Sequence, residues 1–247
     1  MLSGKTAFIT GSNRGIGKAI LEKFLENDAD IICAVRKIDH KFSNYINLQS
    51  KKFNKDIKIL QFDLKDENAT KKSIEELYTK KNSLDILVNN AGIPGGSLTE
   101  MTPIKSLRDM FEINFFAQIK IIQLLLRLLK KSSSASIINI GSVSGLFAER
   151  GNLTYGSSKA ALMFATKIMA KEFSIYKIRV NAIAPSVTKT DMLKKMDKKA
   201  KEKLLKDSNL SEPISPNDVA NKALYLASEK SIDINGQIIE MNEGFKN

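Results

Sequence analysis

A tyrosine and a lysine near the middle of the chain have the spacing of a reactive pair. Tyr155 and Lys159 stand four positions apart in "TYGSSK", so a helix over this stretch places them on one face. An ordinary phenol has a pKa of about 10 and is a poor acid–base group at neutral pH. A neighbouring ammonium favours the phenolate and lowers that pKa. The pair is therefore a candidate for acid–base catalysis, although Tyr-x-x-x-Lys alone also occurs at ordinary polar helix starts.

A glycine-rich turn near the N-terminus is the second stretch that indicates chemistry. In "TGSNRGIG", Gly11, Gly15 and Gly17 fall between a predicted strand and a predicted helix. Glycines at such a turn let the backbone approach a pyrophosphate, and the following helix directs its N–H groups and dipole at the phosphates. The spacing G-x-x-x-G-x-G differs from that of the larger dehydrogenases and from the P-loop of nucleotide hydrolases. It predicts a dinucleotide-binding turn.

The end of the second predicted strand indicates which nicotinamide cofactor binds. An acid at this position would hydrogen-bond the ribose 2′-hydroxyl of NAD, whereas a basic residue favours the 2′-phosphate of NADP. The strand ends in "AVRK", with Arg36 and Lys37 and no acid at its tip. Arg14, inside the glycine turn, supplies a second cation for the same phosphate. These residues predict NADP(H) as the cofactor.

Alternating strands and helices are predicted to position these residues. Short apolar runs predict strands over 6–10, 30–35, 57–62, 84–90, 136–141, 178–184 and 237–242. Helical patterns cover 15–28, 40–54, 67–82, 100–131, 153–176 and 216–228. This alternation predicts one α/β domain over residues 1–247, a Rossmann-like doubly wound sheet of about seven parallel strands with helices on both faces. The polar, Lys-rich segment 186–211 is predicted to form a substrate lid.

Composition and charge restrict the class of protein. The 247 residues are 43% hydrophobic and carry a formal net charge of +12, but acidic residues are mixed into most of the basic stretches. The single cysteine, Cys33, excludes an intramolecular disulfide and fits a reducing compartment. The N-terminus lacks a signal-peptide pattern, and the longest apolar run, 121–129, is too short to span a bilayer. A soluble cytoplasmic protein is predicted, with no metal site and no nucleic-acid or membrane partner.

Taken in order along the chain, the motifs resemble those of the short-chain dehydrogenase/reductase family. The resemblance covers nearly the whole chain and runs through "TGSNRGIG", Asp63, "NNAG" (89–92), Asn114, Ser142 and "YGSSK". Within the family the chain most resembles the 3-oxoacyl-[acyl-carrier-protein] reductases, through "IRVNAIAPSVTKTDM" and the ending "INGQIIEMNEG".

The resemblance implies a role for each matching residue. Tyr155 would donate a proton to the substrate carbonyl oxygen, Ser142 would hydrogen-bond that oxygen, and Lys159 would bind the nicotinamide ribose. Asn114 would anchor a water linked to Lys159, and Asp63 would hold the adenine amino group. The predicted catalytic residues are Asn114, Ser142, Tyr155 and Lys159. The predicted cofactor-binding residues are Gly11, Ser12, Asn13, Arg14, Gly15, Ile16, Gly17, Arg36, Asp63, Leu64, Asn90, Ala91, Gly92, Tyr155, Lys159, Pro185, Thr188 and Thr190.

Three stretches depart from the family pattern. Ser186 stands where a glycine is usual, Glu243 stands in the C-terminal Gly-Gly, and "IPGGSLTEM" (93–101) replaces the usual loop. If the usual glycine needs a positive φ, Ser186 is strained. Because the C-terminal segment commonly packs at a subunit interface, Glu243 bears on the tetramer typical of the family.

The predicted reaction is the NADPH-dependent reduction of a ketone to a secondary alcohol. The first predicted substrate is a 3-oxoacyl thioester on acyl carrier protein, in fatty acid biosynthesis. A docking patch for that acidic carrier, near the mouth of the site, is predicted from the basic residues Arg127, Lys130, Lys131, Lys171, Lys177 and Arg179. The route to Tyr155 is predicted to be lined by Phe147, Glu149 and Arg150.

Two alternatives stay open. One is an NADP-dependent enzyme of the same family that acts on a sugar, nucleotide-sugar or polyol carbonyl. The other, from a different class, is a regulatory or scaffold protein that binds NADP(H) without important turnover. A homo-oligomer, either tetramer or dimer, is predicted for the enzyme.

Overall fold

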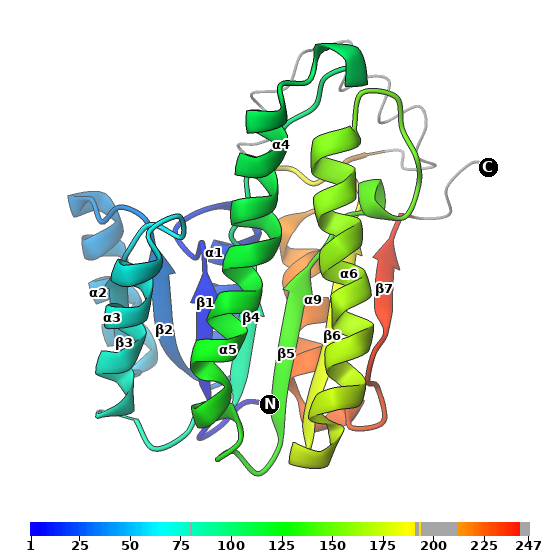
Figure 1. The fold of residues 1–247 in the computed structure, drawn as a ribbon. Coiled ribbons are helices and arrows are strands. Elements are labelled where there is room, and N and C mark those ends of the chain that lie inside the picture. Colours follow the sequence, from blue (N-terminus) through cyan, green and yellow to red (C-terminus); the bar gives the residue numbers. More distant parts are fainter. Residues whose placement is uncertain (80, 191–192, 194–211, 243–247) are drawn as a thin grey trace.

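Seven parallel strands form a single sheet in this computed structural model, which describes residues 1–79, 81–190, 193 and 212–242 (Figure 1). The strands are β1 (Thr6–Thr10), β2 (Asp30–Val35), β3 (Ile57–Gln61), β4 (Ile86–Asn89), β5 (Ala135–Ile140), β6 (Ile178–Pro185) and β7 (Ile238–Met241). Their order is β3-β2-β1-β4-β5-β6-β7. The predicted Rossmann-like sheet in one domain is confirmed.

Helices cover both faces of the sheet. They are α1 (Gly15–Leu25), α2 (His40–Phe53), α3 (Glu67–Tyr78), α4 (Ile104–Phe111), α5 (Ala117–Leu129), α6 (Leu153–Phe173) and α9 (Pro216–Ala227). One face carries α1, α2 and α9, and the other carries α3, α5 and α6 (Figure 1). Strand alternation produces the two layers, since Ala7 and Ile9 face the first group whereas Phe8 faces the second.

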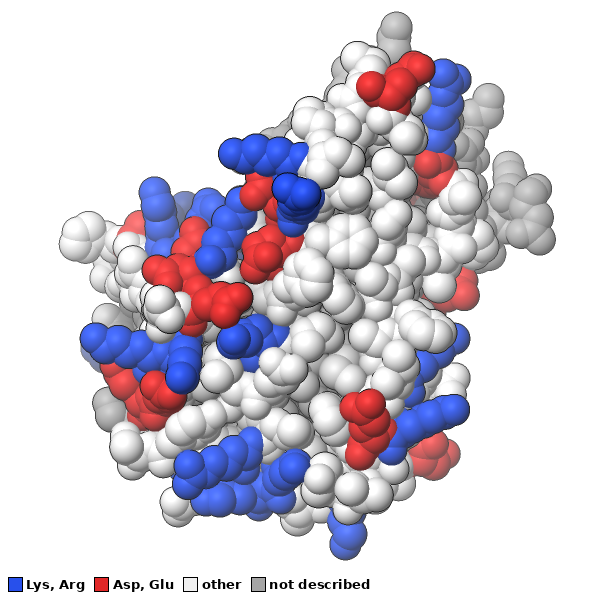
Figure 2. Space-filling view, viewed as in Figure 1, with Lys and Arg blue, Asp and Glu red and all other residues white. Residues whose placement is uncertain are grey.

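The surface over α5 and α6 differs from its surroundings. Figure 2 shows that the middle of this face is largely uncharged, with most charged side chains near its margins. In the described part of the chain, no helix is both long and apolar enough to cross a bilayer.

The predicted helix over 100–131 is wrong at its start and in its middle. A short 3-10 helix, η1 (Thr99–Met101), precedes Pro103, and α4 begins only at Ile104. Proline disfavours helical geometry in the residue before it, which explains the late start. The π-helix η2 (Glu112–Phe116) then joins α4 to α5. Such π-segments are frequent at functional sites, and η2 contains Asn114.

The predicted lid over 186–211 lies mostly outside the described residues. Where the structure describes its flanks, Thr188 pairs with Ile214 in an isolated parallel bridge. Lys189 Nζ lies 2.5 Å from a carboxylate oxygen of Glu212. These contacts join the residues after β6 to those before α9.

The strand order reverses between β1 and β4. β1 pairs with β2 on one side and with β4 on the other. In doubly wound sheets, ligands bind at this reversal, outside the carboxyl ends of the strands. The fold therefore brings the glycine turn after β1 and the "NNAG" segment after β4 to one crevice.

A buried and an exposed leucine test how much core packing contributes to the stability of the fold. Leu21 on α1 is fully buried, whereas Leu48 on α2 is 65% exposed. We expect Leu21→Ala to lower the free energy of unfolding by about 2–5 kcal/mol, because it leaves a cavity. Leu48→Ala should change it by less than about 0.5 kcal/mol. Urea unfolding followed by circular dichroism measures both, and equal losses would contradict the packing of α1 on the sheet.

Candidate active site

The glycine turn has the backbone geometry of a phosphate-binding loop. Gly11 and Gly15 have φ values of +65° and +52°, a region that glycine adopts readily. A Cβ on Gly17 would lie 2.3 Å from the Gly11 carbonyl oxygen, so only glycine fits there. The Arg14 side chain does not cap α1, and the first turn of this helix holds no acid. The first N–H groups of α1 are thus available to an anion, and the turn fits a pyrophosphate.

Thr10 and Asn90 hold this turn against the end of β4. The Thr10 hydroxyl accepts hydrogen bonds from the backbone N–H groups of Asn90 and Ala91, both at 2.9 Å. The Asn90 amide donates to the carbonyls of Thr10 and Gly11, at 2.9 and 3.1 Å. The Asn90 side chain therefore shapes the turn from within. Sequence reasoning did not identify Thr10 as a site residue, although a hydroxyl directly before Gly11 was an available signal.

The other predicted residues of the turn differ in exposure. Ser12 is fully buried beside the Cys33 thiol, whereas Asn13 and Arg14 are exposed and Ile16 is half-buried. Burial raises the pKa of the Cys33 thiol to about 12, so this cysteine is unreactive. The exposed pair is the part of the turn that can reach a ligand with its side chains.

The end of β2 presents cations to the crevice. Arg36 follows β2 directly and is exposed, like Arg14. Neither forms an ion pair with a described acid. The nearest acid after β2, Asp39, caps α2 by accepting a hydrogen bond from Phe42 N at 2.7 Å. The site therefore fits a 2′-phosphate at this end of the sheet.

Asp63 and Leu64 stand at the end of β3, where the resemblance places the adenine. The Asp63 carboxylate accepts a hydrogen bond from Lys65 N at 3.0 Å. Its backbone carbonyl accepts one from the Thr70 hydroxyl at 3.3 Å. These bonds hold the half-buried Asp63 at the carboxyl edge of the sheet, which is where a contact to adenine requires it.

Ser142, Tyr155 and Lys159 lie together where β5 ends and α6 begins. The Ser142 hydroxyl forms a hydrogen bond with the Tyr155 phenol. Lys159 Nζ lies 5.9 Å from the centre of the Tyr155 ring and donates to the Ile140 carbonyl at 2.7 Å. Since β5 and α6 meet only through folding, the cluster is a product of the tertiary structure.

Burial controls the electrostatics of this cluster. It raises the pKa of the Tyr155 phenol, and the hydrogen bond with Ser142 offsets part of that rise. It lowers the pKa of the Lys159 ammonium to about 8. Sequence reasoning expected Lys159, together with an oxidised nicotinamide, to lower the pKa of Tyr155. For the protein's own groups the net shift is upward, because removal of the phenol from water is the larger effect.

Asn114 joins the cluster through the loop after β4. Its side-chain oxygen accepts from Ile93 N at 2.9 Å, and its amide donates to the Ile93 carbonyl at 3.0 Å. The amide also lies 3.2 Å from the Ser158 hydroxyl. A Cβ on Gly92 would lie 3.1 Å from Asn114 Oδ1 and 3.6 Å from Lys159 Nζ, so these three residues meet closely. The Asn114 side chain thus fixes the loop that borders Lys159.

Gln118 is a site-supporting residue that sequence reasoning missed. It stands one turn after Asn114, and its amide donates to the carbonyls of Ala91 and Ile113, both at 2.9 Å. The available signal was a glutamine four positions after Asn114, which places both side chains on one face of the helix.

The residues after β6 cover the glycine turn. Pro185 and Thr188 are buried, and a Cβ on Gly15 would lie 3.3 Å from the Thr190 methyl group. Thr190 therefore lies against the turn, as its predicted cofactor contact requires. Ser186 does not have a positive φ, so serine in place of the usual glycine causes no backbone strain.

The comparisons with known proteins agree with this geometry. Residues 5–201 match the family model described as short chain dehydrogenase. The chain belongs to the short-chain dehydrogenase family. It is 32% identical to the 3-oxoacyl-[acyl-carrier-protein] reductase FabG of Aquifex aeolicus, over 98% of both chains. It is 31% identical to the protein of that name from Thermotoga maritima, again over 98% of both.

Two solved structures of other proteins have the same fold. A 7α-hydroxysteroid dehydrogenase complexed with NADH and 7-oxo glycochenodeoxycholic acid has a TM-score of 0.90, 29% identity, and coverage of 99% of this chain and 95% of its own. The Pseudomonas aeruginosa RhlG/NADP active-site complex has a TM-score of 0.87, 31% identity, and coverage of 99% and 97%. As a short-chain dehydrogenase, the protein is an NAD(P)-dependent oxidoreductase that acts on C=O or CH–OH groups.

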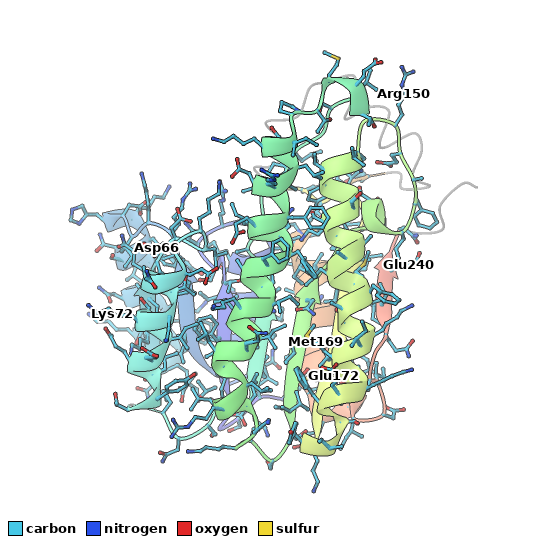
Figure 3. All side chains as sticks on the ribbon, viewed as in Figure 1. Asp66, Lys72, Arg150, Met169, Glu172 and Glu240 are labelled. Carbon is cyan, nitrogen blue, oxygen red and sulfur yellow. The ribbon has the colours of Figure 1, made fainter. Side chains whose placement is uncertain are left out.

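A hollow of about 640 Å³ lies beside the start of α6, the helix that carries Tyr155. Its lining residues are Leu98, Thr99, Glu100, Glu149, Arg150, Gly151 and Leu153. Figure 3 shows Arg150 at the tip of the molecule, above the start of α6. Glu149 and Arg150 line this hollow, but Phe147 and Tyr155 do not. We call this hollow the outer chamber, and the predicted route past Phe147, Glu149 and Arg150 to Tyr155 stays a prediction.

The predicted basic docking patch does not lie near the mouth of the dehydrogenase site. The basic residues follow the C-terminal ends of α5 and α6, whereas Tyr155 stands at the start of α6. Since α6 has 21 residues, its ends are about 31 Å apart. Arg150 and Glu172 accordingly lie at opposite ends of the molecule in Figure 3. Arg179, which was predicted to belong to the patch, is buried and donates to the carbonyl of Leu226 at 2.9 Å.

Burial of the Lys159 ammonium costs the folded dehydrogenase stability. The pKa of Lys159 is about 8 in the folded protein, below its ordinary 10.5, so a buried charge is present below pH 8. We expect Lys159→Met, without cofactor, to raise the free energy of unfolding at pH 7 by on the order of 1–3 kcal/mol, after the lost bond to Ile140 is counted. The gain should shrink as the pH rises from 8 to 10.5. The Lys159 amine is neutral in the folded protein above pH 8 and in the unfolded protein above pH 10.5, so its burial then no longer removes a charge from water.

Urea unfolding at several pH values between 7 and 10.5 measures this difference. Lys171→Met, on an exposed turn of the same helix, is the control and should give a difference that does not depend on pH. A Lys159→Met protein that is less stable than the wild type at pH 7 would show that burial does not dominate.

Proposed function

We propose that this short-chain dehydrogenase reduces a ketone to a secondary alcohol with NADPH, and that its substrate is a 3-oxoacyl thioester on acyl carrier protein. The observation that carries the reduction is the Ser142–Tyr155 hydrogen bond with Lys159 beside it, next to a phosphate-binding turn. The curated relatives named as 3-oxoacyl-[acyl-carrier-protein] reductases support the substrate. The proposed setting is fatty acid biosynthesis in the cytoplasm.

Tyr155 is the proton donor in this proposal. NADPH, when bound, supplies the hydride, and negative charge develops on the substrate oxygen. The raised pKa of the half-buried Tyr155 phenol keeps it protonated at neutral pH, which is the state that a donor needs. The Ser142 hydroxyl, held beside the phenol, hydrogen-bonds the same oxygen as its charge develops. The Lys159 ammonium stabilises the phenolate left after the proton transfer.

The crevice offers a surface for each part of NADPH. The turn over 11–17 would bind the pyrophosphate, and Arg14 and Arg36 would bind the 2′-phosphate. Asp63 and Leu64 would contact the adenine. Pro185, Thr188 and Thr190 would border the nicotinamide half, and Lys159 would bind its ribose.

We also propose that the enzyme is a homo-oligomer that pairs through α5 and α6. This face exposes Phe116, Phe164 and Ile168 by 54%, 66% and 45%, and exposed apolar patches of this kind mark interfaces. Two chains packed antiparallel across it would bring the basic helix ends of one chain beside the outer chamber of the other. An acidic carrier protein would then meet these cations near Tyr155, in addition to Arg150, which lines the outer chamber itself.

A sugar, nucleotide-sugar or polyol carbonyl is the second candidate substrate. The outer chamber supports it, because Thr99, Glu100, Glu149 and Arg150 place polar groups in its lining. A regulatory protein that only binds NADP(H) is disfavoured by the assembled proton-donor cluster, which such a protein does not need.

Turnover of acetoacetyl-acyl-carrier-protein tests both substrate and mechanism. We expect the purified protein to oxidise NADPH with this thioester, and Tyr155→Phe to lower kcat by at least about 10²-fold because the proton donor is gone. The Kd for NADPH should change little. Turnover of keto-sugars without turnover of the thioester would overturn the substrate proposal. Undiminished activity of Tyr155→Phe would overturn the mechanism.

Replacement of Arg36 tests the choice of cofactor. We expect Arg36→Asp to raise the Kd for NADPH by about tenfold or more, because a charge-assisted contact to phosphate becomes a repulsion. The Kd for NADH should stay the same or fall. Lys51→Asp, an equal charge change on the exposed end of α2, is the control and should leave both constants unchanged. Fluorescence titration measures these values, and a native protein that binds NADH as tightly as NADPH would contradict the assignment.

A further inference from the structure

A row of buried polar side chains runs across the sheet beneath the active site. The amide of Asn89 on β4 donates to Asn139 on β5 at 2.9 Å, and the amide of Asn139 donates to the Thr166 hydroxyl on α6 at 2.8 Å. The Thr166 hydroxyl in turn donates to the Leu162 carbonyl at 2.9 Å. All three side chains are at most 1% exposed. Buried polar groups are costly when a partner is lost, so this row specifies the position of its members strongly.

One end of the row reaches the phosphate-binding turn through β4. Asn89 is followed by Asn90, whose amide holds the carbonyls of Thr10 and Gly11. Successive side chains in extended backbone point to opposite sides, which lets these two neighbours serve different partners. A continuous path of hydrogen bonds and backbone therefore joins the turn to α6.

The other end of the row fixes α6 at a second point on β5. Thr166 stands seven positions after Lys159, two helical turns along the same face. Asn139 holds Thr166, and the next residue, Ile140, accepts the hydrogen bond of Lys159 at 2.7 Å. Two attachments to adjacent residues of one strand restrict both the position of α6 along its axis and its rotation.

We propose that Asn139 and Thr166 are positioning residues for the reduction. They hold α6 so that Tyr155 and Lys159 keep their places relative to Ser142 and the phosphate-binding turn. The proposal rests on the proposed roles of Tyr155 and Lys159. A misplacement of reacting groups by about 1 Å can cost about 10²-fold in rate, so the loss of one attachment should be visible in kcat.

Thr166→Val tests the proposal, because it keeps the shape of the side chain and removes the acceptor of the Asn139 amide. We expect kcat to fall about tenfold or more, while the Kd for NADPH changes little. We also expect Tyr155 to titrate at higher pH, since the phenol is then held less closely to the Ser142 hydroxyl, whose hydrogen bond lowers its pKa. Thr166→Ser keeps the hydroxyl and should restore both values.

Ser136→Ala is the matched control. Ser136 is also buried on β5, and its hydroxyl donates to the Leu226 carbonyl at 2.8 Å, away from α6. Its replacement should lower stability without changing kcat or the titration of Tyr155. If Thr166 has a purely structural role, Thr166→Val and Ser136→Ala should have the same kcat and the same titration of Tyr155.

Two readouts separate failure of this proposal from failure of the proposed function. The first is the tyrosinate absorbance of each variant, from which that of its Tyr155→Phe counterpart is subtracted. The difference gives the titration of Tyr155 alone among the five tyrosines, and it needs no substrate. The kcat is measured with acetoacetyl-acyl-carrier-protein or, if that thioester is not turned over, with the fastest carbonyl compound of a panel.

If Tyr155→Phe abolishes turnover and Thr166→Val behaves like Ser136→Ala, the positioning role is wrong and the proposed function stands. If Tyr155→Phe leaves turnover unchanged, the proposed function is wrong, and the titration alone decides the positioning of α6. If Thr166→Val does not fold, Thr166→Ala takes its place. Failure of both to fold, with Ser136→Ala folded, would reduce the role of Thr166 to folding and overturn the proposal.

Discussion

Parallel pairing of all seven strands is the constraint on which the rest of the molecule depends. Because the strands share one direction, the loops that follow β1, β4, β5 and β6 all emerge at one edge of the sheet. The glycine turn, the loop held by Asn114, Ser142 and the segment that reaches Thr190 are such loops or their direct extensions. The same constraint directs the C-terminal ends of α5 and α6 to the opposite edge. It therefore separates the basic helix ends from the cluster of Ser142, Tyr155 and Lys159 in the same chain.

Burial sets the pKa values of Tyr155 and Lys159, the proposed catalytic groups, and lowers the stability of the folded protein. It raises the pKa of Tyr155 and lowers that of Lys159, so that the phenol keeps its proton while the amine approaches the neutral form. Neither change favours stability, since each reflects a polar group removed from water. The hydrogen bonds of Lys159 to the Ile140 carbonyl and of Tyr155 with Ser142 offset part of this cost. Active sites commonly trade stability for function in this way.

Much of the fold and part of the site follow from local features of the sequence. Buried strands appear as short apolar runs, and the alternation with helical patterns leaves few topologies other than a doubly wound parallel sheet. The turn over 11–17 is equally local, because a positive φ at Gly11 and Gly15 and the close approach at Gly17 depend on glycine itself. The placement of Tyr155 and Lys159 on one face of a helix is also local, because it follows from their spacing of four residues. These features can be predicted from the sequence because they depend only on residues that are close together along the chain.

Only the tertiary structure decided which distant groups meet. Sequence alone did not reveal the π-helix at Asn114, since its amide is held by Ile93, a residue of another loop. It did not reveal Thr166, whose hydroxyl is significant only because Asn139 on a separate strand donates to it. Thus the sequence by itself determined the family fold, the glycine turn over 11–17 and the Tyr155–Lys159 spacing. The tertiary structure decided their hydrogen-bond partners and the surroundings that set their pKa values, because both depend on residues far apart along the chain.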